Sequence, residues 1–214
     1  MSITADQEGA PTLRERVYGE LVEMITTGAI PHDGSIRESR MAELLGTSRL
    51  PVREAIQRLE AEGWLERRPR GIARLRIPQE SDLDEVFDMR RLLEVEAVTL
   101  AVRRASLDDV ARLRKLSEEG RAAAAAQDHV RAQEVNTLFH RELAALARHS
   151  VLSEFLETLD RKVHWIFSNV RVERFAEHDD IINALENRDV EAARAAILDH
   201  IEQSHELLKT KLQG

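Results

Sequence analysis

Two arginines stand four positions apart in the run GTSRLPVREAIQRLEAEG, which begins at Gly46 and ends at Gly63. In a helix, this spacing places Arg49 and Arg53 on one face, while the apolar residues of the run fall on the opposite face. A helix that buries one side and presents two arginines near its N-terminus can enter the major groove of DNA, where arginine pairs with guanine. The run therefore predicts a DNA-recognition helix.

The neighbouring residues have the chemistry of a helix start. Ser48 is expected to cap the helix by accepting a hydrogen bond from the N–H groups of the first turn. Pro51 falls in that same turn, where a missing N–H does little harm because those donors have no partners inside the helix. Arg58 follows Glu54 by four residues and is expected to form an ion pair with it rather than contact a base.

A second group of residues could hold a metal ion. Asn136 and His140 are four residues apart, and His178 and His200 follow on two later predicted helices. Neutral imidazoles from three helices of a bundle can converge on one divalent ion. From the residues alone, these histidines could also be structural core residues, so both interpretations stay open. His205 is predicted to lie on a solvated face.

Charge is unevenly distributed along the chain. The 214 residues carry a formal net charge of −8, but residues 1–76 hold 12 Arg and 12 acidic residues, so the excess acid lies in residues 77–214. Between Arg67 and Arg76 there are five Arg and no acid, as a surface against DNA phosphates requires. The chain has no cysteine, which excludes disulfides and Cys-ligated zinc. We predict neither a secretion signal nor a membrane span.

The arginines must be positioned by a small domain of helices and a hairpin. Helical periodicity begins at Thr12, a second helix is predicted from Glu38, and the recognition helix follows. Two short strands are predicted at 64–66 and 73–77, with a tight turn between them. Helices followed by such a hairpin make a winged helix-turn-helix, expected to span residues 12–76.

The histidines must be positioned by a helical bundle. After a short linker at 77–80, the chain contains no proline and shows helical periodicity throughout. Ser81 is expected to cap the first of six helices, and Ser106 with Asp109 forms a capping box at the start of the second. The predicted fold class is therefore mainly α, with an all-α six-helix bundle at 81–212.

The run IRESRMAELLGTSRLPVREAIQRLEAEGWLERRPRG resembles the DNA-binding domain of the GntR family of bacterial transcription regulators. The resemblance covers the predicted N-terminal domain, and the SR-x-PVREA core followed by LEAEG is its most specific part. It implies that Arg49 and Arg53, with Ser48 beside them, contact DNA from the recognition helix. It also implies that Arg70 and Gly71 form the tip of the wing near the minor groove.

The C-terminal part resembles the FCD effector-binding domain of the FadR-type branch of these regulators, in its VanR-like subgroup. The resemblance rests on the order and spacing of the runs MRRLLE, FH, EH and DH, which begin at Met89, Phe139, Glu177 and Asp199. In metal-containing members, three histidines and an aspartate bind a divalent metal, often zinc, at the base of a small-molecule pocket.

The resemblance implies that His140, His178 and His200 bind a divalent metal, zinc or another ion. The expected aspartate is Asn136 in this chain. An amide oxygen can coordinate a metal but brings no charge, so the site would keep the full +2 of the ion. Weaker metal affinity and stronger attraction for an anionic ligand are expected to follow.

Arg90 matches the pocket arginine of the family, whose planar fork suits a bidentate carboxylate. An ion pair with Glu94, four residues later, is the alternative interpretation. We therefore expect a ligand-responsive regulator that binds a pseudo-palindromic operator as a homodimer in the cytoplasm. It is expected to act as a repressor that a small organic acid releases.

Two other functions remain possible at this point. A metal-responsive regulator would use the ion itself as the effector. A three-histidine metallohydrolase would need an open position for water and a carboxylate base. The sequence has no His-Glu-x-x-His motif and no carboxylate clearly placed as a base, so we expect that the protein is not an enzyme.

Overall fold

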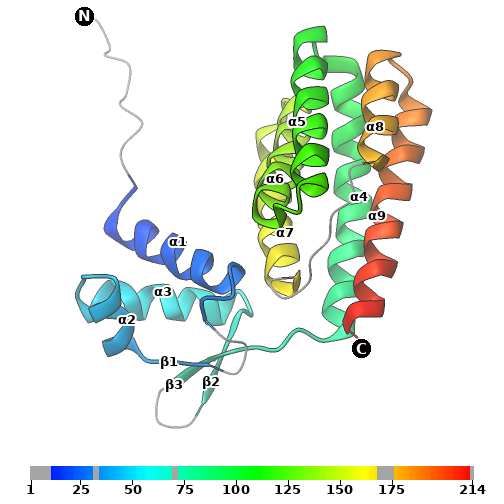
Figure 1. The fold of residues 1–214 in the computed structure, drawn as a ribbon. Helices are drawn as coiled ribbons and strands as arrows, with labels where there is room; N and C mark the ends of the chain where they lie inside the picture. Colours follow the sequence, from blue (N-terminus) through cyan, green and yellow to red (C-terminus); the bar gives the residue numbers. More distant parts are fainter. Residues whose placement is uncertain (1–10, 31–33, 69–71, 168–175, 213–214) are drawn as a thin grey trace, which may run out of the picture. The chain divides into compact units, whose positions relative to one another are not determined.

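The computed structural model of the protein describes residues 11–30, 34–68, 72–167 and 176–212 (Figure 1). The chain forms two compact units, Met1–Ile77 and Pro78–Gly214.

The first unit combines three helices with a small antiparallel sheet of strand order β1-β3-β2. Its described elements are α1 (Leu13–Thr26), β1 (Ser35–Ile36), α2 (Glu38–Leu44), α3 (Arg49–Ala61), β2 (Leu65–Arg68) and β3 (Ile72–Leu75). The three helices and the β2–β3 hairpin agree with the sequence-based prediction, whereas β1 was not predicted. Two residues are too few to show alternation, and Ile36 is recognisable as a strand residue only through its pairing with Ala73.

Helix α1 packs against α3 and holds the recognition helix in place. Val17, Leu21 and Ile25 of α1 are fully buried, as are Val52 and Leu59 of α3. These residues recur at intervals of four in α1 and seven in α3, so the apolar stripe of each helix faces the core and its polar stripe remains outside.

Glycines end the two helices of the helix-turn-helix. Gly46 follows α2 with φ 59°, and Gly63 follows α3 with φ 79°. Side-chain-bearing residues rarely adopt this left-handed conformation, so glycine at each position lets the chain leave the helix without strain.

The second unit contains six helices in its described residues, as predicted (Figure 1). They are α4 (Glu80–Arg104), α5 (Leu107–Ala125), α6 (His129–Leu146), α7 (Ser150–Phe167), α8 (Ala176–Glu186) and α9 (Val190–Leu212). The prediction that Ser81 caps α4 is wrong, because the N-cap is Gln79 and the capping box joins it to Asp82.

Helix α4 lies at the centre of this unit and contacts α6, α7, α8 and α9. Its Phe87 and Leu83 are fully buried, and Ala97 joins a cluster with Leu152 and Leu156 of α7. As a result, α4 touches every helix that carries one of the predicted metal-binding histidines.

The predicted capping box at the start of α5 is confirmed and leads to a pH-dependent contribution to stability. The backbone N–H of Asp109 donates to Ser106 Oγ at 3.2 Å, and the backbone N–H of Ser106 donates to Asp109 Oδ2 at 2.8 Å. These bonds and the neighbouring Arg112 lower the pKa of Asp109 to about 2. Since the folded pKa lies below the unfolded value, the contribution is complete above about pH 4 and is lost as the pH falls towards 2.

We expect Asp109→Asn to lower the free energy of unfolding at pH 7 by about 0.5–2 kcal/mol, the usual range for a lost cap. The difference between variant and wild type should shrink as the pH falls to 2.5, because the wild-type carboxylate then begins to protonate. Urea unfolding at both pH values measures it, with the exposed Asp108→Asn as the control. An equal loss at pH 7 and pH 2.5 would contradict the electrostatic assignment.

Candidate DNA-binding surface and candidate metal centre

Arg49 and Ser48 lie at the start of α3, and both are exposed. Ser48 occupies the N-cap position with φ −80° and ψ 165°, but within the described residues its side chain makes no capping hydrogen bond. The predicted cap is therefore wrong. Pro51 is the third residue of α3, so the N–H to which a serine N-cap most often bonds is missing. The hydroxyl of Ser48 is left on the surface beside Arg49.

Arg53 is half exposed, and its guanidinium is held by a carboxylate that sequence reasoning missed. Its Nε donates to both carboxylate oxygens of Glu38 at 3.0 Å, and its Nη2 donates to Oε2 at 2.9 Å. Glu38 is the first residue of α2 and lies fifteen positions earlier in the sequence. Nothing in the helical spacing of α3 points to it.

Arg58 has a structural role, as expected, but with a different partner. Its Nε donates to Glu62 at 2.8 Å, and its guanidinium carbon lies 3.8 Å from the centre of the Tyr18 ring. Glu54, the predicted partner, instead pairs with Arg14 of α1 at 2.8 Å. The contact of Arg58 with Tyr18 and the ion pair of Glu54 with Arg14 join α3 to α1.

The arginines of the described part of the wing also carry ion pairs. Arg67 of β2 donates to Glu60 in a bidentate arrangement, with Nη2 to Oε2 at 2.7 Å. Arg68 pairs with Glu66 of the same strand. Arg70 and Gly71, predicted to form the wing tip, lie outside the described residues.

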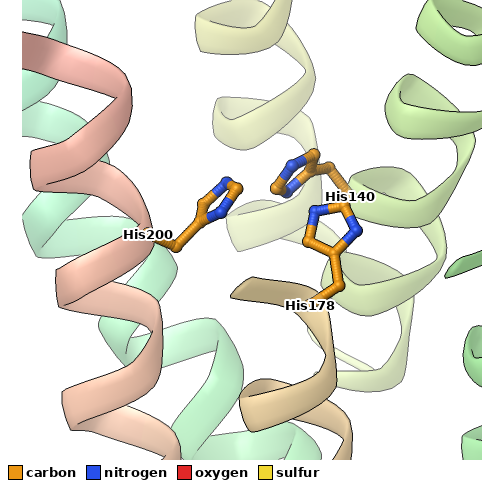
Figure 2. Close-up of side chains that lie close together, drawn as sticks. All are labelled: His140, His178 and His200. Atoms are coloured by element: carbon orange, nitrogen blue, oxygen red, sulfur yellow. The ribbon is translucent and has the colours of Figure 1, made fainter. Parts of the chain in front are cut away.

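The three predicted metal-binding histidines converge in the second unit (Figure 2). His140 comes from α6, His178 from α8 and His200 from α9, and one ring nitrogen of each lies within 4.8 Å of the others. The rings point toward one another in Figure 2, with centroids 4.9 to 5.3 Å apart. His178 and His200 are buried and His140 is partly buried.

An aromatic ring packs against His178, a contact that the sequence did not predict. Phe139 stacks on it face to face, with centroids 3.9 Å apart and an interplanar angle of 7°. Burial lowers the pKa of His178 to about 4, an effect that the neighbouring Asp179 partly opposes. The imidazole is therefore neutral at physiological pH, which is the form that coordinates a metal.

A cavity of about 270 Å³ adjoins the histidine cluster. Its lining includes His140, His200, Asn136 and Arg90, together with apolar side chains of α6 and α7. Asn136 lies one turn before His140, so its amide reaches the same cavity. The structure thus gathers residues from four helices, α4, α6, α7 and α9, around one small volume.

Arg90 forms the ion pair with Glu94 that was the alternative interpretation of its sequence, while its binding of a carboxylate ligand stays a prediction. It lines the cavity, and its Nε also donates to Glu94 Oε1 at 2.5 Å, with both side chains largely buried. Its guanidinium carbon lies 4.8 Å from the centre of the Phe87 ring. The ring of His205 also stacks on Phe87, with centroids 4.6 Å apart, and His205 Nε2 lies 2.8 Å from Asp84 Oδ1. The prediction that His205 is solvated is therefore wrong.

Comparison with known proteins matches both parts of the chain to families. Residues 13–74 match the bacterial regulatory proteins of the gntR family, and residues 85–203 match the FCD domain. The chain belongs to the GntR family of transcription regulators, in the branch that carries an FCD domain. The predicted family and fold class are confirmed.

Individual relatives of this GntR protein agree with the family. It is 31% identical to the probable D-xylose utilization operon transcriptional repressor of Paenarthrobacter nicotinovorans, over 94% of this chain and 91% of the relative. It is 28% identical to the transcriptional regulator YdhC of Bacillus subtilis, over 92% and 91% of the two chains. The solved structure of Escherichia coli McbR/YncC superposes with a TM-score of 0.79 at 25% identity, covering 95% of this chain and all of that one.

These comparisons bear on the competing functions. The GntR family and the relatives are DNA-binding transcription regulators rather than enzymes, so the expectation that the protein is not an enzyme is confirmed.

Among the described residues, none of the helices has the length and apolar character that crossing a membrane requires.

Proposed function

We propose that this GntR regulator is a repressor that a small organic acid releases from its operator, and that the acid binds beside a divalent metal. The observation that carries this proposal is a cluster of three histidines beside a cavity that two of them, His140 and His200, line together with Arg90. The word repressor in the name of the Paenarthrobacter relative supports the sign of regulation.

The residues present fit a metal ion. Three imidazoles face one another, and the buried His178 stays neutral because burial lowers its pKa to about 4. Imidazole nitrogens bind zinc at about 2.0–2.1 Å, so nitrogens up to 4.8 Å apart would have to draw closer around an ion. His140, His178 and His200 would hold it, with Asn136 as a neutral fourth ligand. When bound, the metal would supply a positive centre for an anionic oxygen.

The chemistry of the cavity favours a small carboxylic acid as the effector. Arg90 offers a planar fork to this cavity, and His140 and His200 of the histidine cluster line it as well. Asn136 leaves the charge of the ion uncompensated, which strengthens its attraction for an anion. The rest of the lining is mixed, and its apolar side chains, such as Leu143, Leu156 and Val163, suit a short carbon skeleton.

In the first unit, Arg49 and Arg53 of α3 would read the operator, with Ser48 beside them. One recognition helix reads only a few base pairs, so two half-sites related by a dyad give the specificity that a regulator needs. This supports a homodimer on a pseudo-palindromic operator. A cytoplasmic location follows from that partner.

The effector assignment is tested by thermal shift with a panel of small carboxylates, each with and without a chelator. An acid that binds only the folded protein raises the Tm by mass action. In Arg90→Lys, which keeps the charge but loses the fork, we expect binding to weaken about tenfold or more, since a hydrogen bond to a charged group contributes about 1.5–3 kcal/mol.

Arg91→Lys is the matched control, because Arg91 neighbours Arg90 but pairs with Glu202 outside the cavity lining. This variant should keep the full response. A carboxylate that still shifts the Tm of Arg90→Lys as it shifts wild type would refute the role of Arg90. An effector that leaves operator affinity unchanged in fluorescence anisotropy would refute regulation by that acid.

A further inference from the structure

One carboxylate stands within a basic part of the candidate DNA-binding surface. Glu38 makes three hydrogen bonds to Arg53, all between 2.9 and 3.0 Å. The positive charges of Arg53, Arg49 and Arg67 all act on it, and with the bonds from Arg53 they lower its pKa. Glu38 therefore remains ionised at neutral pH, although a negative charge here repels DNA phosphates.

The geometry of the pair leaves part of the guanidinium unused. An arginine has five N–H donors, and Glu38 takes those along the edge formed by Nε and Nη2. The end-on edge, where Nη1 and Nη2 each have a donor, is the fork that pairs with O6 and N7 of guanine. A carboxylate that grips the first edge thus restricts the direction in which the second can point.

The same pair restricts contacts with phosphate. An arginine on a flexible stem can neutralise any phosphate within reach, which adds affinity without sequence information. Arg53 can reach a phosphate that lies away from its free edge only by giving up charge-assisted bonds to Glu38. The pairing therefore opposes non-specific binding and favours a base contact that the held guanidinium can make.

We propose that Glu38 is a positioning residue that sets the DNA specificity of α3, by aiming Arg53 at a base and withholding it from phosphates. This inference rests on the proposed contact of Arg53 with the operator. Glu38, an acidic residue of α2, would thus influence which base sequence is recognised without touching a base itself.

The test compares two duplexes on the full-length protein by fluorescence anisotropy. One is selected from random DNA by the wild-type protein, and the other is a scrambled duplex of equal length and composition. Glu38→Gln removes the charge, so binding to scrambled DNA should tighten. The ratio of selected to scrambled affinity should fall at least about fivefold, the lower end for a lost bidentate base contact.

Glu38→Asp separates geometry from charge. It keeps the negative charge, but its shorter side chain cannot grip Arg53 in the same way, so the ratio should fall while scrambled affinity rises by less than in Glu38→Gln. A ratio that stays at the wild-type value in either Glu38 variant overturns the positioning role. Partial unfolding lowers both affinities by the same factor, so it cannot imitate a change in the ratio.

Glu60→Gln is the matched control, because Glu60 also holds an arginine, Arg67, in a bidentate pair within the same unit. Its loss should tighten binding to both duplexes equally and leave the ratio unchanged. Arg53→Ala distinguishes the two levels of the proposal. If Arg53→Ala keeps the wild-type ratio of selected to scrambled affinity, Arg53 makes no specific contact with the operator. If Arg53→Ala lowers that ratio while both Glu38 variants keep it, only the role of Glu38 is refuted.

Discussion

Replacing Arg49 with alanine is expected to abolish operator-specific binding while leaving the fold intact. Arg49 is the first residue of α3 and is exposed, so its removal leaves no buried group without a partner. A good bidentate contact between arginine and guanine discriminates by about 1–3 kcal/mol. With two half-sites in a dimer, the loss would be about twice that, enough to reduce operator affinity to the non-specific level.

Fluorescence anisotropy on selected and scrambled duplexes measures this effect, and circular dichroism checks the helices. Arg16→Ala is the control, since Arg16 is an exposed arginine of α1 whose neighbour is Glu20 of the same helix. Removing it should weaken binding to both duplexes slightly, if at all. Operator affinity of Arg49→Ala at the wild-type level would refute the assignment of α3 as the recognition helix.

Removing the metal is expected to produce the second large effect, on the stability of the helical unit. Protein purified without chelator should contain one divalent ion per chain. An ion present at 1,000 times its Kd stabilises the folded state by about 4 kcal/mol. In a domain of this size, each kcal/mol shifts the Tm by roughly 2–4 °C, so a chelator should lower the Tm by about 10 °C.

His178→Ala should lose the bound ion, and a chelator should no longer change its Tm. Because the Tm with chelator is compared with the Tm without it for the same variant, a lower starting Tm does not affect this test. His129→Ala, at the start of the same helix as His140, should keep both. Metal analysis that finds no stoichiometric divalent ion in chelator-free wild type would refute the metal centre. Operator affinity measured with and without metal, in the absence of any acid, separates a ligand-orienting ion from a metal-sensing regulator.

The elements of the fold were largely predictable because their signals are local. Apolar periodicity predicted α3 and the six helices of the second unit, and the Ser106–Asp109 capping box marks the start of α5. Strand β1 escaped prediction because two residues form a strand only when β3 is present to pair with them. The Ser48 cap failed because a nearby residue, Pro51, removes the donor that the motif requires.

The candidate site was only partly predictable because its geometry is not local. Family resemblance identified His140, His178 and His200, but spacing alone could not show that three helices bring them together. The grip of Glu38 on Arg53 depends on how α2 packs against α3, and the two residues share no helical repeat. Residues that act through a distant partner leave no pattern in one sequence.

The pair of Arg90 and Glu94 has a consequence for the concentration at which the regulator would respond. In the proposed function, an incoming acid seeks a guanidinium that already holds a carboxylate of its own chain. A tethered group acts at an effective concentration on the order of millimolar, and no dilution removes it. In the proposed function, Glu94 would therefore compete with the acid for the part of the guanidinium around Nε and raise the detection threshold. At low concentrations of the acid the repressor would stay bound to its operator. Only a higher concentration of the acid would make the repressor dissociate.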